Sequence, residues 1–144
     1  GPVPEERYTV PLGRAKIAKA GQDITLVSAG YGVHLGLEAA EKAQEDGVSV
    51  EVVDLRSLKP LDAGTVLGSA RKTGKVLVVD EDYASYGLSG EIAARIAEDG
   101  DARTAVKRFA RVANPDVPVP FSEPLEEAVL PSVERILDAI RGWA

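Results

Sequence analysis

Short apolar runs alternate with amphipathic segments along most of this chain, at a spacing of about 25 residues. The runs are rich in β-branched residues and predict strands at 24–28, 48–54 and 75–80, with a weaker strand at 105–110. Helical patterns occupy 33–46, 62–72, 89–97 and 132–141. Strands and helices that alternate in this way are typical of a parallel sheet with helices on both faces.

Local signals place the ends of these elements. Asp62 and Ser89 are expected to cap the helices that follow them, and Gly74 and Gly100 to end those helices. Residues 15–19 alternate weakly and predict a short edge strand. The proline-rich passage at 115–124 is expected to contain no regular structure.

The beginning of the chain has a different character from the rest. Residues 1–13 are polar and punctuated by proline, which predicts an extended linker between domains, and residues 14–144 are long enough for one domain. Gly1-Pro2 is a sequence that tag-removing proteases leave behind, so residues 1–13 are interpreted as a tag remnant and a linker. The chain contains no methionine, and we expect it to be part of something longer.

Composition excludes several classes of function. The net charge of −6, from 23 acidic and 17 basic residues, repels polyanions, so no nucleic-acid partner is expected. A local basic cluster is interpreted as a solvated face; it comprises Arg103, Lys107, Arg108 and Arg111. The absence of cysteine excludes disulfides and thiolate metal sites. No apolar run approaches the ~20 residues that span a bilayer, and no membrane partner is expected.

A glycine-rich turn follows the strand predicted at 24–28 and opens the next helix. It has the pattern G-x-G-x-x-x-G from Gly30 to Gly36, in which glycines let the backbone approach a diphosphate at the positive end of a helix. Asp54 ends the next predicted strand, where a dinucleotide fold carries its ribose-binding acid. Gly30, Gly32, Gly36 and Asp54 are therefore candidate nucleotide-binding residues. The other interpretation is that any tight strand-to-helix turn favours glycine, and the spacing misses G-x-G-x-x-G by one residue.

Few other side chains suit catalysis or metal binding. Asp80, Glu81 and Asp82 gather at a strand end, and hard cations prefer such oxygen ligands. Acids in this position are more commonly solvated or cap a helix, so no metal site is expected. His34 lies in the first turn of a predicted helix, where the dipole disfavours its charged form, and it is not assigned a catalytic role.

The order of several sequence blocks resembles one family. The blocks are YTVPLGRA at 8–15, DITLVS at 23–28, VEVVDLRSLKPLD at 50–62, VVDE at 78–81, GEIAA at 90–94, NPDVPVPFS at 114–122, PLE at 124–126 and LP at 130–131. Together they resemble the C-terminal domain of the beta subunit of thiamine diphosphate-dependent 2-oxo acid dehydrogenases, of the pyruvate, branched-chain and acetoin type. The resemblance covers nearly the whole chain, and the block at 50–62 is its most specific part.

This resemblance implies the transketolase C-terminal fold, a three-layer α/β/α domain with a mixed, mostly parallel five-stranded sheet. Residues 15–19 are our choice for its antiparallel strand. The resemblance also implies that thiamine diphosphate and magnesium bind in other domains of the parent enzyme, and that this domain holds no cofactor and no catalytic residue. The parent reaction would be the oxidative decarboxylation of a 2-oxo acid with acyl transfer to lipoyl, in the bacterial cytoplasm or the mitochondrial matrix.

What the resemblance assigns to such a domain is assembly. The implied partners are the alpha subunit, a second beta subunit, and the small subunit-binding domain of the acyltransferase core, which is basic and suits an acidic chain. The candidate interface residues are Tyr83, Tyr86, Glu123, Glu126, Glu127, Trp143 and the terminal carboxylate of Ala144. An equally open alternative is that the last helix only packs on its own sheet.

One block departs from the family pattern. Many relatives have an Arg-Thr-Gly-Gly turn after the Asp-Glu pair, whereas here the turn reads DYASYGLSG at 82–90. The subfamily and the substrate therefore stay open. So do two rival interpretations of the chain, an independent NAD(P)- or nucleotide-binding domain that uses the Gly30–Gly36 turn and an isolated folding module.

Overall fold

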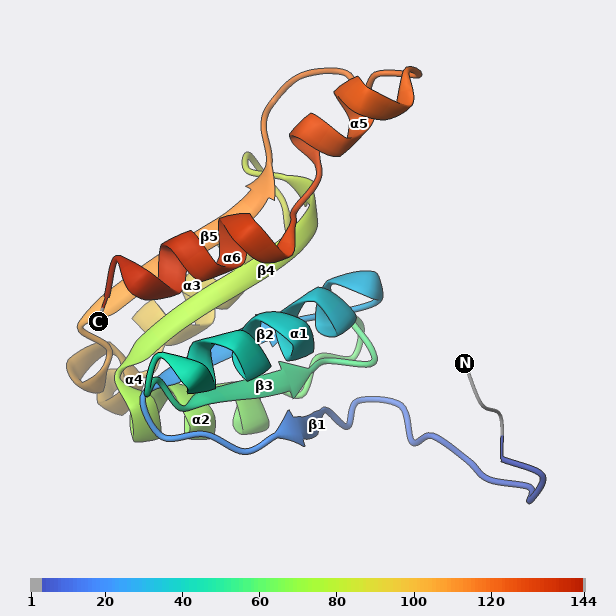
Figure 1. Ribbon diagram of the computed structural model, residues 1–144. Coiled ribbons are helices and arrows are strands. Elements are labelled where there is room, and N and C mark those ends of the chain that lie inside the picture. Colours follow the sequence, from blue (N-terminus) through green and yellow to red (C-terminus); the bar gives the residue numbers. More distant parts are fainter. Residues whose placement is uncertain (1–3, 144) are drawn as a thin grey trace.

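The computed structural model describes residues 4–143 (Figure 1). Its strands are β1 (Lys16–Lys19), β2 (Ile24–Ser28), β3 (Val50–Asp54), β4 (Lys75–Tyr83) and β5 (Arg108–Asn114). Its helices are α1 (Tyr31–Glu45), α2 (Ala63–Thr73), α3 (Leu88–Glu98), α4 (Gly100–Ala105), α5 (Glu123–Val129) and α6 (Val133–Arg141). No helix within 4–143 is long and apolar enough to cross a membrane.

The strands form one mixed sheet in the order β1-β3-β2-β4-β5. Strands β2, β3, β4 and β5 are parallel to their neighbours, and β1 pairs with β3 antiparallel. The antiparallel edge strand predicted at 15–19 is thereby confirmed, as is the mostly parallel five-stranded sheet. Because the chain runs from β2 to β3 on one side and returns to β4 on the other, the sheet reverses its winding between β2 and β4.

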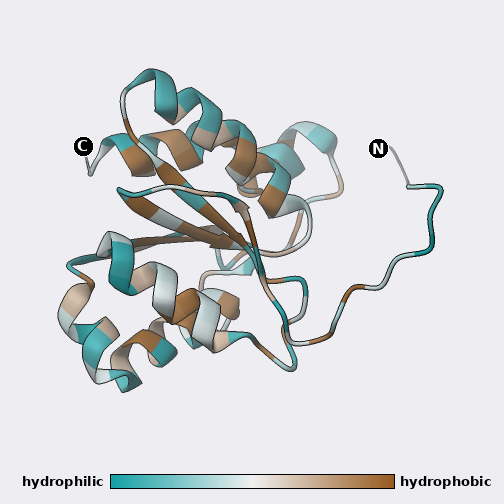
Figure 2. Cartoon of the chain, turned by 90° about the horizontal axis from the view of Figure 1, so that it is seen from below, coloured by the Kyte–Doolittle hydropathy of each residue, from teal (hydrophilic) through white to brown (hydrophobic). Residues whose placement is uncertain are grey.

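Helices cover both faces of the sheet, as Figures 1 and 2 show. Side chains alternate between the two faces along each strand. In β4, Leu77 and Val79 pack with helices α1 and α6, whereas Val76 and Val78 pack with α2, α3 and α4. Figure 2 shows the hydrophobic residues on the strands and on the helix surfaces that face them. The domain therefore has two apolar cores, one on each side of a sheet whose central strands are buried.

Two glycines, Gly32 and Gly36, set the distance between helix α1 and the sheet. A Cβ atom on Gly32 would lie 2.3 Å from Ser28 Oγ, and one on Gly36 would lie 2.7 Å from a methyl carbon of Leu26. Neither separation is possible for a real side chain, so glycine at these two positions lets the helix approach β2 closely. This packing explains two of the three glycines in the turn without a ligand.

A buried polar cluster lies between α2 and the sheet. Glu51 of β3 is only 3% exposed. It accepts hydrogen bonds from Ser69 Oγ at 2.5 Å and Gly21 N at 3.4 Å, and forms an ion pair with Lys72. Ser69 Oγ is in turn 2.7 Å from Thr25 Oγ1. Burial raises the pKa of Glu51, but its bonds with Lys72, Ser69 and Gly21 outweigh burial and hold that pKa below its ordinary value.

Several predicted boundaries are confirmed. Asp62 caps α2 by accepting a hydrogen bond from the Thr65 backbone at 3.2 Å, and Gly74 ends that helix in a left-handed conformation. Ser132 caps α6, accepting a hydrogen bond from the Arg135 backbone at 3.2 Å. Capping chemistry therefore placed both ends of α2 correctly, and the helical pattern placed the start of α6 near Ser132.

Other predictions about the second half of the chain were wrong. The capping position of α3 is Gly87 and not Ser89, which is buried in the first turn of that helix. Gly100 does not end a helix but begins α4, which Asp99 caps through the Ala102 backbone at 2.7 Å. Strand β5 covers 108–114 and not 105–110. The proline-rich passage is irregular as far as Ser122, but its last two residues begin a helix, α5. Pro124 is compatible with that helix because it stands in the first turn, where proline needs no hydrogen-bond partner.

Candidate functional site

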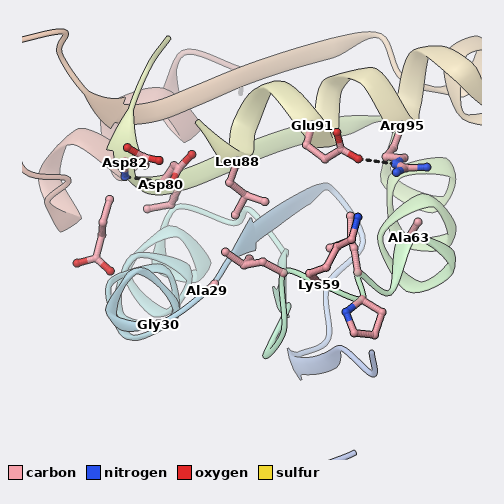
Figure 3. Close-up of a pocket in the computed structure, with 14 residues that line it drawn as sticks. Ala29, Gly30, Lys59, Ala63, Asp80, Asp82, Leu88, Glu91 and Arg95 are labelled. Atoms are coloured by element: carbon pink, nitrogen blue, oxygen red, sulfur yellow. Dashed lines mark hydrogen bonds and ion pairs between the residues drawn. The ribbon is translucent and has the colours of Figure 1, made fainter. Parts of the chain in front are cut away.

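An open pocket of about 780 Å³ lies at the carboxyl edge of the sheet (Figure 3). It opens beside the ends of β2 and β4, the point at which the winding reverses and where open α/β sheets most often bind ligands. Its lining comes from β2 and the turn after it, the loop before α2, the end of β4, and α3. The lining residues are Ala29, Gly30, Leu58, Lys59, Pro60, Leu61, Ala63, Val79, Asp80, Glu81, Asp82, Leu88, Glu91 and Arg95.

The first of the candidate glycines does line this pocket. Gly30 has a φ of 60°, a conformation that side-chain-bearing residues rarely adopt, so glycine is required by the turn itself. Gly32 and Gly36 are buried against the sheet. The geometry of all three glycines is thus accounted for by the turn and by packing.

The charges around this turn disfavour a diphosphate. The Glu81 carboxylate lies 3.5 Å from the position that a Cβ atom on Gly30 would occupy, and Asp80 and Asp82 line the same wall. An anion at the start of α1 would therefore meet carboxylates as well as the helix dipole. Asp54 stands outside the lining, where its Oδ1 accepts the Arg56 backbone N–H at 3.0 Å. The structure does not assemble Gly30, Gly32, Gly36 and Asp54 into one nucleotide site.

The strand-end acids have a structural role instead. Asp80 is buried; its Oδ2 accepts the Ser89 backbone N–H at 3.0 Å and its Oδ1 accepts that of Asp82 at 3.1 Å. It therefore caps α3 from the end of β4. Within residues 4–143, no group of three or more acidic or histidine side chains is arranged to hold a metal ion.

The cations of the pocket lie at its other end. Arg95 Nε donates to Glu91 Oε1 at 2.7 Å, one turn apart on α3, and Lys59 points into the space between these residues and Ala29 (Figure 3). The floor is apolar, with Leu88 and Val79. The pocket thus has one acidic wall, formed by Asp80, Glu81 and Asp82, and an opposite wall on which Arg95 is paired with Glu91.

A second exposed surface lies beyond the carboxyl ends of β4 and β5 and includes α5. Five of the residues predicted as interface are found there, namely Tyr83, Tyr86, Glu123, Glu126 and Glu127. Helix α5 has no buried residue and stands away from the body of the domain (Figure 1). Large apolar side chains are exposed around it, namely Val117, Val119, Phe121 and Leu125. We call the group of Tyr83, Tyr86, Val117, Val119, Phe121 and Leu125 the tip surface.

The other predicted interface residues do not join this surface. Trp143 is half-buried at the opposite end of the domain and packs against the core on the side of α1 and α6. Lys75 Nζ donates to the Trp143 carbonyl at 2.8 Å, and Arg108 Nη1 donates to that of Gly142 at 3.2 Å. Ala144 lies outside the described residues. The structure therefore divides the predicted interface into two separate places.

Two further features of the sequence, His34 and the basic cluster, lie on the surface of the domain. His34 lies on the exposed side of α1, with its ring centroid 6.1 Å from that of Tyr31. In the basic cluster, Lys107 and Arg108 donate to backbone carbonyls of Thr104 and Gly142, and Arg111 does so to Ala84. These cations stabilise chain ends and loops, as a solvated structural face would.

The family model of the transketolase C-terminal domain matches residues 13–136 of this chain. The chain belongs to the transketolase C-terminal domain family. The matched residues include all five strands and every helix except the second half of α6. The fold expected from the sequence is thereby confirmed.

Curated relatives of this family member are beta subunits of dehydrogenases. It is 42% identical over 142 residues to the acetoin:2,6-dichlorophenolindophenol oxidoreductase subunit beta of Cupriavidus necator, covering 98% of this chain and 41% of the relative. It is 38% identical to the mitochondrial pyruvate dehydrogenase E1 component subunit beta-1 of Arabidopsis thaliana (96% and 39%) and to the 2-oxoisovalerate dehydrogenase subunit beta of Bacillus subtilis (100% and 44%). The chain thus spans about two fifths of their length.

Solved structures agree with this assignment. A split-gene transketolase, solved as an inactive beta4 tetramer, superposes with a TM-score of 0.81 at 30% identity, covering 98% of this chain and 44% of that one. The transketolase of Campylobacter jejuni superposes with a TM-score of 0.56 at 14% identity, covering 90% and 18%, which shows the shared fold alone.

Sequence reasoning missed Phe121 of the tip surface and the residue pair Ser85 and Asp116 beside it. Ser85 and Asp116 join the turn after β4 to the chain after β5, with Ser85 Oγ donating to Asp116 Oδ2 at 2.7 Å. Phe121 is fully exposed. The available signal was an aromatic residue within a proline-rich passage, which we interpreted only as irregular structure.

Proposed function

We propose that this chain is the non-catalytic C-terminal domain of a 2-oxo acid dehydrogenase beta subunit and that it serves subunit assembly. The observation that carries the proposal is its similarity, over at least 96% of its own length, to the beta subunits of a pyruvate dehydrogenase, a 2-oxoisovalerate dehydrogenase and an acetoin oxidoreductase. The chain matches only about two fifths of each relative, and we assign the catalytic residues to the remaining three fifths. The parent reaction would be oxidative decarboxylation of a 2-oxo acid with acyl transfer to lipoyl.

Thiamine diphosphate and magnesium would bind elsewhere in the parent enzyme. The Gly30–Gly36 turn does not fit the diphosphate, since it faces the Glu81 carboxylate. Among the described residues, no cluster of acids or histidine could hold the metal. No step of the reaction is therefore assigned to this domain.

The tip surface supports an assembly role. Isolated exposed apolar side chains are ordinary, but Tyr83, Tyr86 and Val117 line one hollow, and such a gathering beside acidic residues is typical of a protein interface. The proposed partners are the alpha subunit and a second beta subunit. The third proposed partner is the basic subunit-binding domain of the acyltransferase, with the C-terminal end and Glu123, Glu126 and Glu127 as its candidate contacts. The parent would work in the bacterial cytoplasm or the mitochondrial matrix.

A size measurement tests this proposal. A chimeric beta subunit would carry this chain in place of the matching 142 residues of the Cupriavidus necator protein and be produced with that enzyme's companion subunits. Light scattering after gel filtration should give the mass of the native assembly, whereas a beta subunit truncated at the same point should not assemble. A folded chimera that remains as separate subunits would rule the role out.

The rival nucleotide function has its own test. Calorimetric titration of the chain with NAD, NADP and ATP is expected to give no heat of binding, because of the carboxylates beside Gly30. Binding in the micromolar range would favour the rival. Glu81→Gln is the informative variant for such a signal, since Gly32→Val would overlap Ser28 and disturb the packing of α1 whether or not a ligand binds.

A further inference from the structure

Tyr86 has a backbone conformation that its residue type disfavours. Its φ is 61°, in the left-handed region where a Cβ atom crowds the backbone. Its side chain is fully exposed, at 105% of the reference area, so the ring contributes no burial to the fold. Glycine would adopt this φ without strain. Tyrosine is thus unfavourable here for folding alone.

The turn that holds Tyr86 is fixed from several sides. Ser85 donates both its backbone N–H, at 3.1 Å, and its Oγ, at 2.7 Å, to the carboxylate of Asp116. The backbone N–H of Ala84 donates to the Asn114 carbonyl at 2.8 Å, and the carbonyl of Ala84 accepts from Arg111. The end of β5 therefore fixes the turn, and the ring of Tyr86 is held outward on an ordered backbone.

A shallow hollow of about 580 Å³ adjoins this ring. It is lined by Tyr83, Ser85, Tyr86, Asp116, Val117 and Pro118. Two aromatic rings and two aliphatic residues offer apolar contact, and Asp116 supplies a carboxylate whose pKa is held low by its bonds from Ser85 and, to a smaller extent, by the nearby Arg111. A flexible alkyl chain that ends in a cation matches this combination.

Charge at this end of the domain selects the kind of partner. The acids of the tip and its surroundings are Asp82, Asp116, Glu123, Glu126 and Glu127. The neighbouring cations Arg111 and Arg135, which donate to the backbone carbonyls of Ala84 and Ala113, offset only part of this charge, so the named groups are negative on balance. A second copy docked on the same surface would bring like charges together, whereas a basic segment would be attracted.

We propose that the hollow between Tyr83 and Tyr86 receives a lysine or arginine side chain from a basic segment of a partner protein, with Tyr86 as its pre-ordered aromatic anchor. This deepens the proposed assembly function and rests on it, because it names the chemistry by which the tip surface recognises a partner. Holding the ring ready lowers the conformational entropy lost on binding, which is a reason for a partner surface to retain a strained residue.

Peptide titration followed by NMR tests the proposal. The ¹⁵N-labelled chain is titrated with acetyl-Gly-Arg-Gly-amide and with the same peptide containing citrulline, which keeps the shape of arginine but has no charge. The arginine peptide should shift the amide signals of Ser85, Asp116 and Val117, and the citrulline peptide should bind at least about tenfold more weakly. Tyr86→Gly should weaken arginine binding by a similar factor, and Tyr31→Ala, which removes an exposed tyrosine from α1, should not change it.

The outcomes are distinct. Equal shifts from both peptides, or arginine binding that survives in Tyr86→Gly, would overturn the proposal. Shifts of the same amides with protein concentration, in the absence of peptide, would show that a second copy occupies the hollow and would also overturn it. Because the assembly role is measured by the mass of the chimeric enzyme, either proposal can fail while the other is upheld.

Discussion

Asp80, the buried acid near the end of strand β4, accepts the backbone N–H of Ser89 in the first turn of helix α3 at 3.0 Å. Gly87, the capping residue of that helix, has no side chain to do this. Only glycine fits at this position, because a Cβ atom on Gly87 would lie 2.3 Å from the Tyr83 carbonyl oxygen. The cap of α3 therefore comes from a residue nine positions away from Ser89 in sequence.

Replacing Asp80 with alanine should destabilise the domain by about 1–2 kcal/mol, the usual cost of a lost helix cap. Asp80→Asn should cost less, because its amide oxygen still accepts a hydrogen bond. Urea unfolding followed by circular dichroism measures both. Addition of Mg²⁺ or Ca²⁺ should leave the wild-type midpoint unchanged, and a midpoint that rises with either ion would contradict the capping role.

Glu51→Gln should lower the free energy of unfolding by about 1–3 kcal/mol at neutral pH. The substitution removes the charge that pairs with Lys72 inside the polar cluster beneath α2, while the buried position remains. Glu38→Gln is the matched control, since Glu38 forms an exposed pair with Lys42 on α1 and such pairs contribute little. Equal midpoints for the two variants would show that the Glu51 cluster is not stabilising.

The same cluster predicts a dependence on pH. The pKa of Glu51 in the folded protein lies below its ordinary value of 4.5, so the unfolded chain takes up this proton first as the pH falls. The stabilisation by Glu51 is fully present above that ordinary value and is lost as the pH falls through the folded-state pKa. The stability difference between wild type and Glu51→Gln should therefore shrink below pH 4.5, and a difference that grows there would have the wrong sign.

Tyr86→Gly should raise the free energy of unfolding by about 0.5–1 kcal/mol. The gain is the left-handed strain of about 1–2 kcal/mol that is relieved, less the greater chain entropy that glycine loses on folding. Tyr86→Ala removes the same ring but keeps a Cβ atom, and should give no such gain. Thermal unfolding of both variants distinguishes strain in the backbone from any effect of the ring itself.

Gly36→Ala should destabilise the domain by about 1–3 kcal/mol, because the new methyl group would overlap Leu26 and push α1 from the sheet. Gly68→Ala is a suitable control, since Gly68 lies within α2 and a Cβ atom there has no neighbour within 4 Å. That control should be neutral or slightly stabilising. A Gly36→Ala variant as stable as the control would remove the packing explanation of this glycine.

Sequence reasoning was most successful where one signal dominates. Strands β2 and β3 and residues 76–79 of β4 are buried on both faces and are rich in β-branched and aliphatic residues, a pattern that leaves little alternative to a buried strand. Asp62 was correctly predicted as a cap because it bonds to a backbone N–H three residues further on. Local pattern and local contact coincide at these positions.

The errors arose where distant contacts decide. The cap of α3 depends on Asp80, and strand β5 begins late because α4 intervenes, a helix of six residues with little periodicity. The candidate interface residues were named without knowledge that Tyr83 and Trp143 stand near opposite ends of the sheet. The positive φ of Tyr86 has no sequence signal, since it results from bonds between the turn and the end of β5.

Acetoin-dependent reduction of 2,6-dichlorophenolindophenol by the chimeric Cupriavidus necator enzyme tests the central claim most directly. If this chain is a scaffold domain that assembles a beta subunit, the chimera should reduce the dye with acetoin, and a beta subunit truncated at the same point should not. An assembled and folded chimera without activity, or a truncated subunit with full activity, would contradict the account.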